Sequence, residues 1–344
     1  MTYIIGEIGQ NHNGSVDIAK LIIDFAANPI REDLFGLELK PMNAVKLTKR
    51  DLNEELSASQ MNRPYDSAHS FGKTYGEHRA FLELNDEQHF ECFKHAKSYG
   101  LDFVETLCAI GCLSLLKYFT PDKLKVASRD LTNLPLLNAL AETKIPIILS
   151  TGMAGEAELD AALNTITKHH NAISILHCVS QYPTEPKNAN LNTIKYLQQK
   201  FPQYTIGYSD HTIGISAPVA AVAMGAKIIE KHITLDRRMK GTDQAGSLGT
   251  DGINRMVRDI RLLELSFGKE ELFIEPSVLS ARVKLERSIA TNKDLKNGYV
   301  ITENDIHMLS PGDGFKWTDK NLVVGKTLLS VVKKNEIIYK ENLK

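Results

Sequence analysis

Short hydrophobic runs alternate with amphipathic stretches along most of the chain. Eight of the runs have the length of a strand and end in polar residues, and helical spacing of apolar positions is found between most of them. Strands that alternate with helices form parallel βα units, because each helix returns the chain to the start of the next strand. The predicted strands are Tyr3–Ile8, Ala44–Thr48, Asp102–Glu105, Leu124–Ala127, Pro146–Leu149, Ile173–Leu176 and the runs within 205–212 and 228–234.

Eight βα units predict an α/β fold, a closed (β/α)8 TIM barrel, with an open doubly wound sheet as the alternative. In dinucleotide-binding sheets, a G-x-G-x-x-G sequence directly follows the first strand. No such sequence follows the first run of this chain, which favours the barrel. Two segments interrupt the alternation. The first is Asn28–Asn43, whose Pro29 and Gly36 argue against one unbroken helix, and the second is the polar excursion Thr48–Leu84. A loop as long as the second usually lines or covers a site.

The composition changes near Arg282, where short β-like runs separated by turns replace the βα alternation. We therefore predict a barrel domain over 1–269, a linker over 270–281 and a small β-rich domain over 282–344. The strands expected in the small domain are Ser288–Thr291, Val300–Ile301, Leu322–Val324 and Thr327–Val332.

The polar residues at the strand ends include cations, hydroxyls, acids and imidazoles. Because the carboxyl ends of barrel strands meet on one face, we expect these side chains to share one bowl. Such a mixture suits a phosphorylated carboxylate held beside a metal ion. The residues are Glu7, Lys46, Thr106, Lys125, Ser128, Asp130, Ser150, His177, Ser209, His211 and His232.

His211 and His232 end the last two predicted strands, and one crossover helix, Ile215–Gly225, separates these strands. Parallel neighbours would bring the two imidazoles to one rim, where they suit Mn, Fe, Co or Zn. A single histidine in such a place more often only caps its strand through a backbone carbonyl. The pair in register favours a metal site.

The composition is that of an ordinary globular enzyme. The formal net charge of -1 argues against nucleic-acid and membrane-surface binding, and no run approaches the roughly 18 apolar residues of a membrane span. The four cysteines form no C-x-x-C pair, and the first residues lack the basic and apolar regions of an export signal. We expect a cytoplasmic protein with reduced thiols.

Six motifs together resemble the sialic acid synthase family, whose members condense phosphoenolpyruvate with an N-acylated amino sugar. They follow the family's order over nearly the whole chain, and the last domain resembles the antifreeze-like (SAF) domain of these synthases. The motifs are Glu7–Gly14, Lys125–Ser128, Leu149–Met153, Gln181–Pro183, Tyr208–Thr212 and Glu230–Thr234.

The resemblance implies a transferase that produces phosphate and a nine-carbon 2-keto-3-deoxy sugar acid. It places a divalent metal on His211 and His232, with manganese first and magnesium or cobalt as alternatives. It implies that these histidines act in catalysis together with the acids Glu7 and Asp130. The phosphoenolpyruvate-binding positions that it implies are Lys46, Thr106, Lys125, Ser128, Ser150 and Ser209. The sugar-binding positions that it implies are Tyr182 and Asp243. We add Asn11 and Lys73 as further sugar-binding candidates.

The acceptor and the assembly also follow from the resemblance, which implies a homodimer whose SAF domain reaches over the partner's barrel. Ser310 stands where members that use free N-acetylmannosamine carry an arginine that contacts the sugar from the partner subunit. The loop Arg63–Leu84 within the excursion is similar to that of animal synthases that use the 6-phosphorylated sugar, and its basic residues include Arg63, Lys73, His78 and Arg79. We expect N-acetylmannosamine or a related hexosamine as the acceptor, with its 6-phosphate as the alternative.

Two further departures lie beside the expected site. Glu105-Thr106-Leu107 replaces Ser-Thr-Pro, and Thr48 replaces a glutamine. Two other functions also compete with the synthase. A non-catalytic sugar-binding barrel would have no use for lysines beside a histidine pair, and an aldose phosphate acceptor, as in the related octulosonate and heptulosonate phosphate synthases, does not fit the SAF-like tail.

Overall fold

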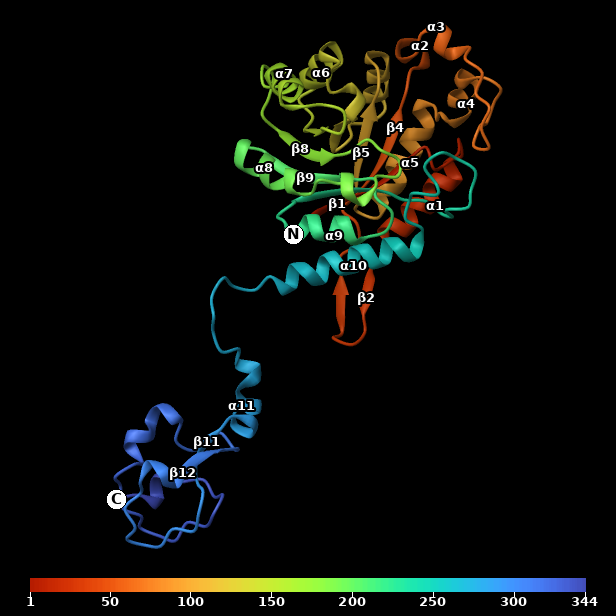
Figure 1. Cartoon of the computed structure of the whole chain (residues 1–344). Coiled ribbons are helices and arrows are strands. Elements are labelled where there is room, and N and C mark those ends of the chain that lie inside the picture. The colour runs from red at the N-terminus through yellow and green to blue at the C-terminus, as the bar shows by residue number, and fades with distance from the viewer. The chain divides into compact units, whose positions relative to one another are not determined.

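Eight parallel strands close into a barrel in the order β1-β10-β9-β8-β7-β6-β5-β4 (Figure 1). This computed structural model describes all of residues 1–344. The closed barrel confirms the predicted fold, and each of the eight predicted runs forms a strand. The strands are β1 (Tyr3–Gly9), β4 (Ala44–Lys49), β5 (Asp102–Leu107), β6 (Lys123–Val126), β7 (Ile147–Ser150), β8 (Ile173–Cys178), β9 (Thr205–Asp210) and β10 (Ile228–His232).

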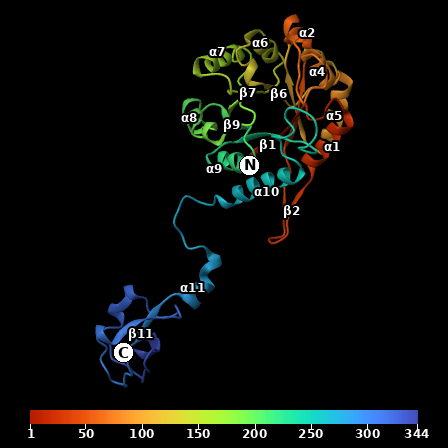
Figure 2. The ribbon, with the colours of Figure 1, turned by 45° about the vertical axis from the view of Figure 1, so that its right-hand side comes forward.

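Helices surround the barrel, and their apolar faces form the main core against the outward-facing strand residues. Helices α1 and α5 are far apart in the sequence but lie side by side in both views (Figures 1 and 2), and Lys20 contacts Glu91 across them at 2.8 Å. A 3₁₀ helix, Ile110–Lys117, takes the place of an α-helix between β5 and β6. The other helices of the ring are α1 (Val16–Ala27), α5 (Asp86–Ser98), α6 (Leu134–Glu142), α7 (Glu156–Ile166), α8 (Asn192–Lys200), α9 (Ser216–Ala223) and α10 (Thr250–Ser266).

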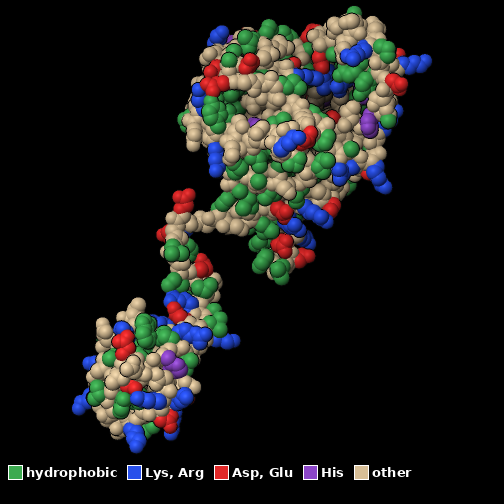
Figure 3. Space-filling view, viewed as in Figure 1, with side chains coloured by type: hydrophobic (Ala, Val, Ile, Leu, Met, Phe, Trp, Pro, Cys, Tyr) green, Lys and Arg blue, Asp and Glu red, His purple; other side chains and the backbone are tan.

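The two segments that interrupted the sequence alternation have structure of their own. The first contains an antiparallel hairpin of β2 (Ile30–Glu32) and β3 (Leu37–Leu39), and hydrophobic side chains gather on it in Figure 3. The second contains the short helices α2 (Leu52–Glu55) and α3 (Ala58–Met61) and then α4 (Tyr75–Leu82). Thr74 and Glu77 form a capping box that fixes the start of α4.

Side chains that point into the barrel change from apolar to polar along the strands. A small apolar cluster fills the interior, and it consists of Ile5, Ala44, Val104, Ile148, Leu176 and Ile228. Successive side chains of a strand point to opposite faces, so the residue two positions further on also points inward. On five of these six strands that residue is polar, and on β8 it is Cys178. The apolar cluster therefore forms the floor below the polar cavity.

Residues Lys269–Lys344 form a second unit with a core of its own. The unit contains the 3₁₀ turn Pro276–Val278 and helix α11 (Leu279–Leu285). An antiparallel pair of strands, β11 (Ser288–Thr291) and β12 (Ile306–Leu309), follows. The predicted strand Leu322–Val324 is wrong, because the apolar residue Val323 is buried at the end of a 3₁₀ helix, Trp317–Leu322. Val300–Ile301 and Thr327–Val332 contribute only isolated bridges. Two further 3₁₀ turns are Glu303–Asp305 and Lys340–Asn342.

None of the helices is long and apolar enough to cross a membrane.

Candidate active site

A cavity of about 510 Å³ opens above the apolar floor of the barrel. All eight strands contribute one residue each to its deepest layer. On six strands this residue lies two positions after a residue of the apolar floor, and on β6 and β9 it lies at the same height in the barrel. The layer consists of Glu7, Lys46, Thr106, Lys125, Ser150, Cys178, Ser209 and Glu230. Six of these eight are predicted site residues, and Cys178 and Glu230 were missed as such. The period of two along each strand could have identified both.

Lys46 is buried at the centre of this layer. Its ammonium lies 2.8 Å from the Glu7 carboxylate and 3.8 Å from that of Glu230, and it donates a hydrogen bond to the Thr106 hydroxyl at 3.1 Å. Burial raises the pKa of Glu7 to about 7, although Lys46 opposes the shift. Burial also disfavours the charge on Lys46, but Glu230 and Glu7 outweigh it and raise its pKa. Lys46 therefore remains a cation.

Glu230 connects the two buried lysines. Its carboxylate lies 3.7 Å from the Lys125 ammonium and accepts a hydrogen bond from the Ser209 hydroxyl at 3.0 Å. Burial opposes ionisation of Glu230, but Lys125 and Lys46 outweigh it and lower the pKa to about 2. Burial lowers the pKa of Lys125, although Glu230 opposes this shift. The layer thus contains two lysines around one firmly ionised carboxylate. A dianionic ligand could be held there by the lysines.

One wall of the cavity depends on a glycine. Gly152 donates its backbone N–H to the Ser128 hydroxyl at 3.0 Å. A Cβ atom at position 152 would lie 2.5 Å from the Ser180 hydroxyl, 2.8 Å from that of Ser128 and 2.9 Å from the Cys178 sulfur. A side chain at position 152 would require the Ser128 and Ser180 hydroxyls and the Cys178 sulfur to shift. The hydroxyl of Ser150, on the strand before Gly152, is buried without a hydrogen-bond partner and is free to bind a ligand.

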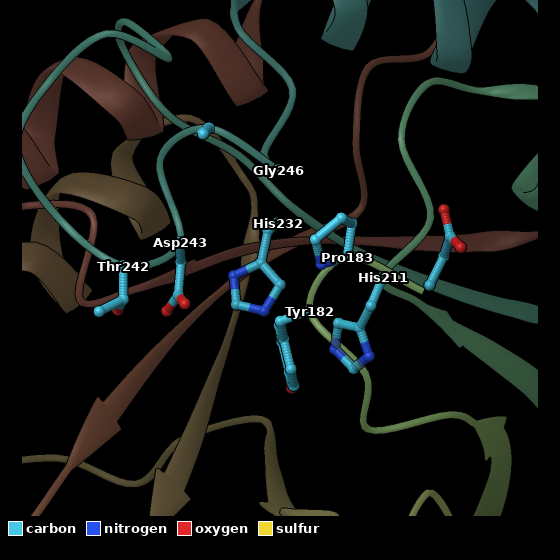
Figure 4. Close-up of a pocket in the computed structure, with 9 residues that line it drawn as sticks. Tyr182, Pro183, His211, His232, Thr242, Asp243 and Gly246 are labelled. Carbon is cyan, nitrogen blue, oxygen red and sulfur yellow. The ribbon is translucent and has the colours of Figure 1, made fainter. Parts of the chain in front are cut away.

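His211 and His232 lie together above this layer, with ring centroids 5.6 Å apart (Figure 4). The strand register explains this, because Asp210 on β9 pairs with Lys231 on β10 and the next residues are the histidines. His211 Nδ1 lies 2.9 Å from the Val179 carbonyl oxygen, and Nδ1 of His232 is buried without a partner. The Tyr182 ring lies beside both imidazoles, with its centroid 4.1 Å from that of His211.

The two imidazoles could hold a divalent ion. Histidine ring nitrogens are ligands for Mn, Co and Zn, and the buried nitrogen of His232 that lacks a partner is suited to coordination. No group of three or more His, Cys, Asp or Glu side chains is placed to bind a metal. A metal here would therefore need substrate or water oxygens to complete its coordination.

Arginines extend the cavity toward its rim, and Figure 3 shows basic side chains around a hollow in the barrel unit. Arg50 and Arg129 both pair with Glu55, at 2.5 and 3.2 Å. Arg79 on α4 also lines the cavity. Sequence reasoning missed Arg50 and Arg129. Both lie just past the end of a strand, and Arg129 directly follows the motif Lys125–Ser128.

The structure brings most of the predicted site residues into this cavity. The lining includes Glu7, Lys46, Thr106, Lys125, Ser128, Ser150, Tyr182, Ser209, His211, His232 and Asp243.

Four predicted positions do not line the cavity, and they are Asn11, Lys73, Asp130 and His177. Asn11 is buried beside it and donates its amide N–H groups to the Ile233 carbonyl and the Ser247 hydroxyl at 2.9 Å, which is a structural role. Lys73 is exposed at the start of the turn into α4. The Asp130 carboxylate accepts a hydrogen bond from Arg129 at 3.2 Å. Of the strand-end histidines, His177 bonds to the Ala189 carbonyl at 2.8 Å and packs on Tyr208, away from the cavity.

Known proteins match both units. The NeuB family matches residues 40–272 and the SAF domain matches residues 286–344. N-acetylneuraminate-9-phosphate synthase of Homo sapiens is 33% identical over 341 residues, which cover 98% of this chain and 92% of that protein. N,N'-diacetyllegionaminic acid synthase of Campylobacter jejuni is 31% identical, with 98% of each chain covered. A solved N-acetylneuraminic acid synthetase of Leptospira borgpetersenii in complex with citrate has a TM-score of 0.67 and 30% identity, and the match covers 81% of this chain and 90% of that one.

Proposed function

We propose that this chain, which belongs to the NeuB family, is a sialic acid synthase that condenses phosphoenolpyruvate with an N-acylated hexosamine such as N-acetylmannosamine. A carbon–carbon bond forms between the methylene carbon of phosphoenolpyruvate and the sugar aldehyde, one water is consumed, and phosphate leaves as the 2-keto group forms. One observation supports this most. The layer with the two lysines and, above it, the histidine pair lie in the same cavity.

The lysine layer is the proposed phosphoenolpyruvate site. A phosphate and a carboxylate carry almost three negative charges, and burying them requires matched cations and hydrogen-bond donors. Lys46 and Lys125 supply the cations, and the hydroxyls of Ser150, Ser128 and Ser209 supply donors. The firm negative charge of Glu230 keeps both lysines in place when no ligand is present.

The histidine pair is the proposed metal site, with manganese as the first candidate and magnesium or cobalt as alternatives. A bound divalent ion would polarise the aldehyde oxygen of the acceptor as a Lewis acid. Tyr182 and Asp243 lie next to the imidazoles in the same cavity and would orient the sugar. Glu7, whose pKa lies near 7, could exchange a proton at neutral pH, and it is the proposed acid–base group.

The assembly that we propose is a cytoplasmic homodimer in which the SAF domain of one subunit completes the site of the other. The support is the family membership and the separate core of residues Lys269–Lys344, which would allow this unit to dock away from its own barrel. Domain exchange between identical protomers is a low-cost way to form a dimer.

Phosphate release tests the proposed function. The full chain is supplied with phosphoenolpyruvate, manganese and a panel of mannosamine derivatives, and released phosphate and the keto acid product are measured. We expect release that requires both phosphoenolpyruvate and an N-acyl acceptor. Binding of an acceptor without any release, in every metal tried, would instead favour a sugar-binding barrel.

A further inference from the structure

Arg79 differs from the other cations of the cavity in having no carboxylate partner. Its guanidinium donates to the Tyr75 hydroxyl, at 2.9 Å from Nε and 2.8 Å from Nη2, and to the side-chain oxygen of Gln10. Lys46, Lys125, Arg50 and Arg129 each lie near at least one carboxylate. The positive charge of Arg79 is therefore not neutralised within the chain.

The position of Arg79 is built into the fold. Gln10, just past the end of β1, donates its amide N–H to Glu83 at 3.1 Å, and this fixes its oxygen toward the guanidinium. The ring of Tyr75 lies under the same group, with 5.0 Å between the guanidinium carbon and the ring centroid. These neighbours use three of the five N–H donors of the guanidinium, which leaves two for a ligand. A half-buried, fixed arginine with free donors is suited to an anion.

The charges of the cavity indicate which substrate carries this anion. The two deep lysines already match the phosphate and carboxylate of phosphoenolpyruvate, whereas Arg79 comes from the excursion and Gln10 lies beyond the end of its strand. An acceptor whose aldehyde reaches the histidine pair would extend away from the deep layer, so its far end would lie toward the rim. Building on the proposed function, we propose that Arg79 is a specificity-determining residue that binds a phosphate monoester at the end of the sugar acceptor remote from its aldehyde.

Lys73, the sugar-binding candidate in the same excursion, is less suitable. Its side chain is exposed and does not line the cavity, while Arg79 does. Arg63 belongs to the same excursion and is also exposed, which makes it a matched control.

The test compares kcat/KM for N-acetylmannosamine 6-phosphate and for N-acetylmannosamine in the full-length enzyme. We expect the wild type to prefer the phosphorylated acceptor by at least about tenfold, and Arg79→Gln to reduce this ratio by about 30-fold, chiefly through KM for the sugar phosphate. Arg79→Lys should restore part of the preference, and Arg63→Gln should leave it as in the wild type. A wild type that prefers the unphosphorylated sugar, or loss of the preference in Lys73→Ala instead, would overturn the assignment.

Two further measurements separate the possible failures. If Arg79→Gln raises KM for phosphoenolpyruvate as much as for the sugar phosphate, Arg79 binds the other substrate and the proposal is wrong. If no acceptor releases phosphate, the proposed function fails, and calorimetric titration still tests Arg79 directly. In that case the wild type should bind the sugar phosphate at least about tenfold more tightly than Arg79→Gln does, and equal affinities would refute the role of Arg79.

Discussion

The ammonium of Lys46 lies 2.8 Å from the carboxylate of Glu7 in the deepest polar layer of the barrel. A buried cation that already has carboxylate neighbours is held in position before any ligand arrives. A phosphate that enters this layer therefore meets a positioned charge and does not have to order a flexible one.

Replacement of either deep lysine should weaken phosphoenolpyruvate binding selectively. We expect Lys46→Met and Lys125→Met each to raise KM for phosphoenolpyruvate by about 100-fold, because a buried phosphate loses a charge-assisted partner. KM for the sugar should change much less. Steady-state kinetics with each substrate varied in turn measures both constants, and equal effects on the two would count against this assignment.

The histidine pair should be required for metal binding and turnover. His211→Ala and His232→Ala should each lose measurable turnover and bound metal, with the melting temperature of the metal-free protein nearly unchanged. Metal content by mass spectrometry and thermal melts provide the readouts. His170→Ala, which alters a histidine remote from the barrel mouth, is the matched control. Full activity after exhaustive chelation would contradict the metal site.

The composite site can be tested by mixing two inactive proteins. The first is the chain ended at Gly268, whose barrel is intact but has no C-terminal unit, and the second is full-length His211→Ala. If the C-terminal unit of one subunit completes the partner's site, activity should appear when the two proteins are mixed and allowed to exchange. Light scattering should report a dimer for the full chain. A fully active chain 1–268, or no recovery in mixtures that do form heterodimers, would exclude the composite arrangement.

Asp305 should make the C-terminal unit less stable at low pH. Burial opposes its ionisation, but hydrogen bonds from Lys293 and Thr302 outweigh burial and lower the pKa of Asp305 to about 2. Because the folded pKa is below the unfolded value, the stabilisation is present above about pH 4 and is lost as the pH falls toward 2. We expect the loss to be about 2 kcal/mol, and Asp305→Asn should lose a similar amount at neutral pH.

Trp317, the only tryptophan of the chain, lies in this unit and reports its unfolding by fluorescence. Denaturant titrations at pH 6 and pH 2.5 measure the free energy of unfolding. Its difference between the two pH values should be smaller for Asp305→Asn than for the wild type. The exposed Glu341→Gln should behave as the wild type does. An acid dependence that is unchanged in Asp305→Asn would show that other carboxylates cause it.

The barrel could be predicted from the sequence because its strands are short and apolar, and because segments with helical spacing of apolar residues lie between most of them. The deep layer was accessible for the same reason, since Lys46 and Lys125 are charged residues within otherwise apolar runs. Glu230 belongs to the same pattern, and counting two positions from Ile228 would have found it.

The rim could not be predicted in this way. Whether Arg79 or Lys73 faces the cavity depends on how α4 packs, and the sequence pattern of a polar excursion carries no period that would decide it. The C-terminal unit was also harder, because its core residue Val323 lies in a 3₁₀ helix. Short apolar runs are ambiguous when turns and isolated bridges, not long ladders, hold a small domain together.

Asp210 pairs with Lys231, so the register between β9 and β10 determines where the two imidazoles lie. A single residue inserted within β10 before His232 would turn that imidazole outward and bring the preceding side chain into the cavity. The crossover between the strands carries no such constraint, so α9 and its loops could lengthen or shorten while the imidazoles keep their place. We therefore expect insertions and deletions between these strands to be tolerated in the crossover, and to be excluded from the strand ends that carry the histidines.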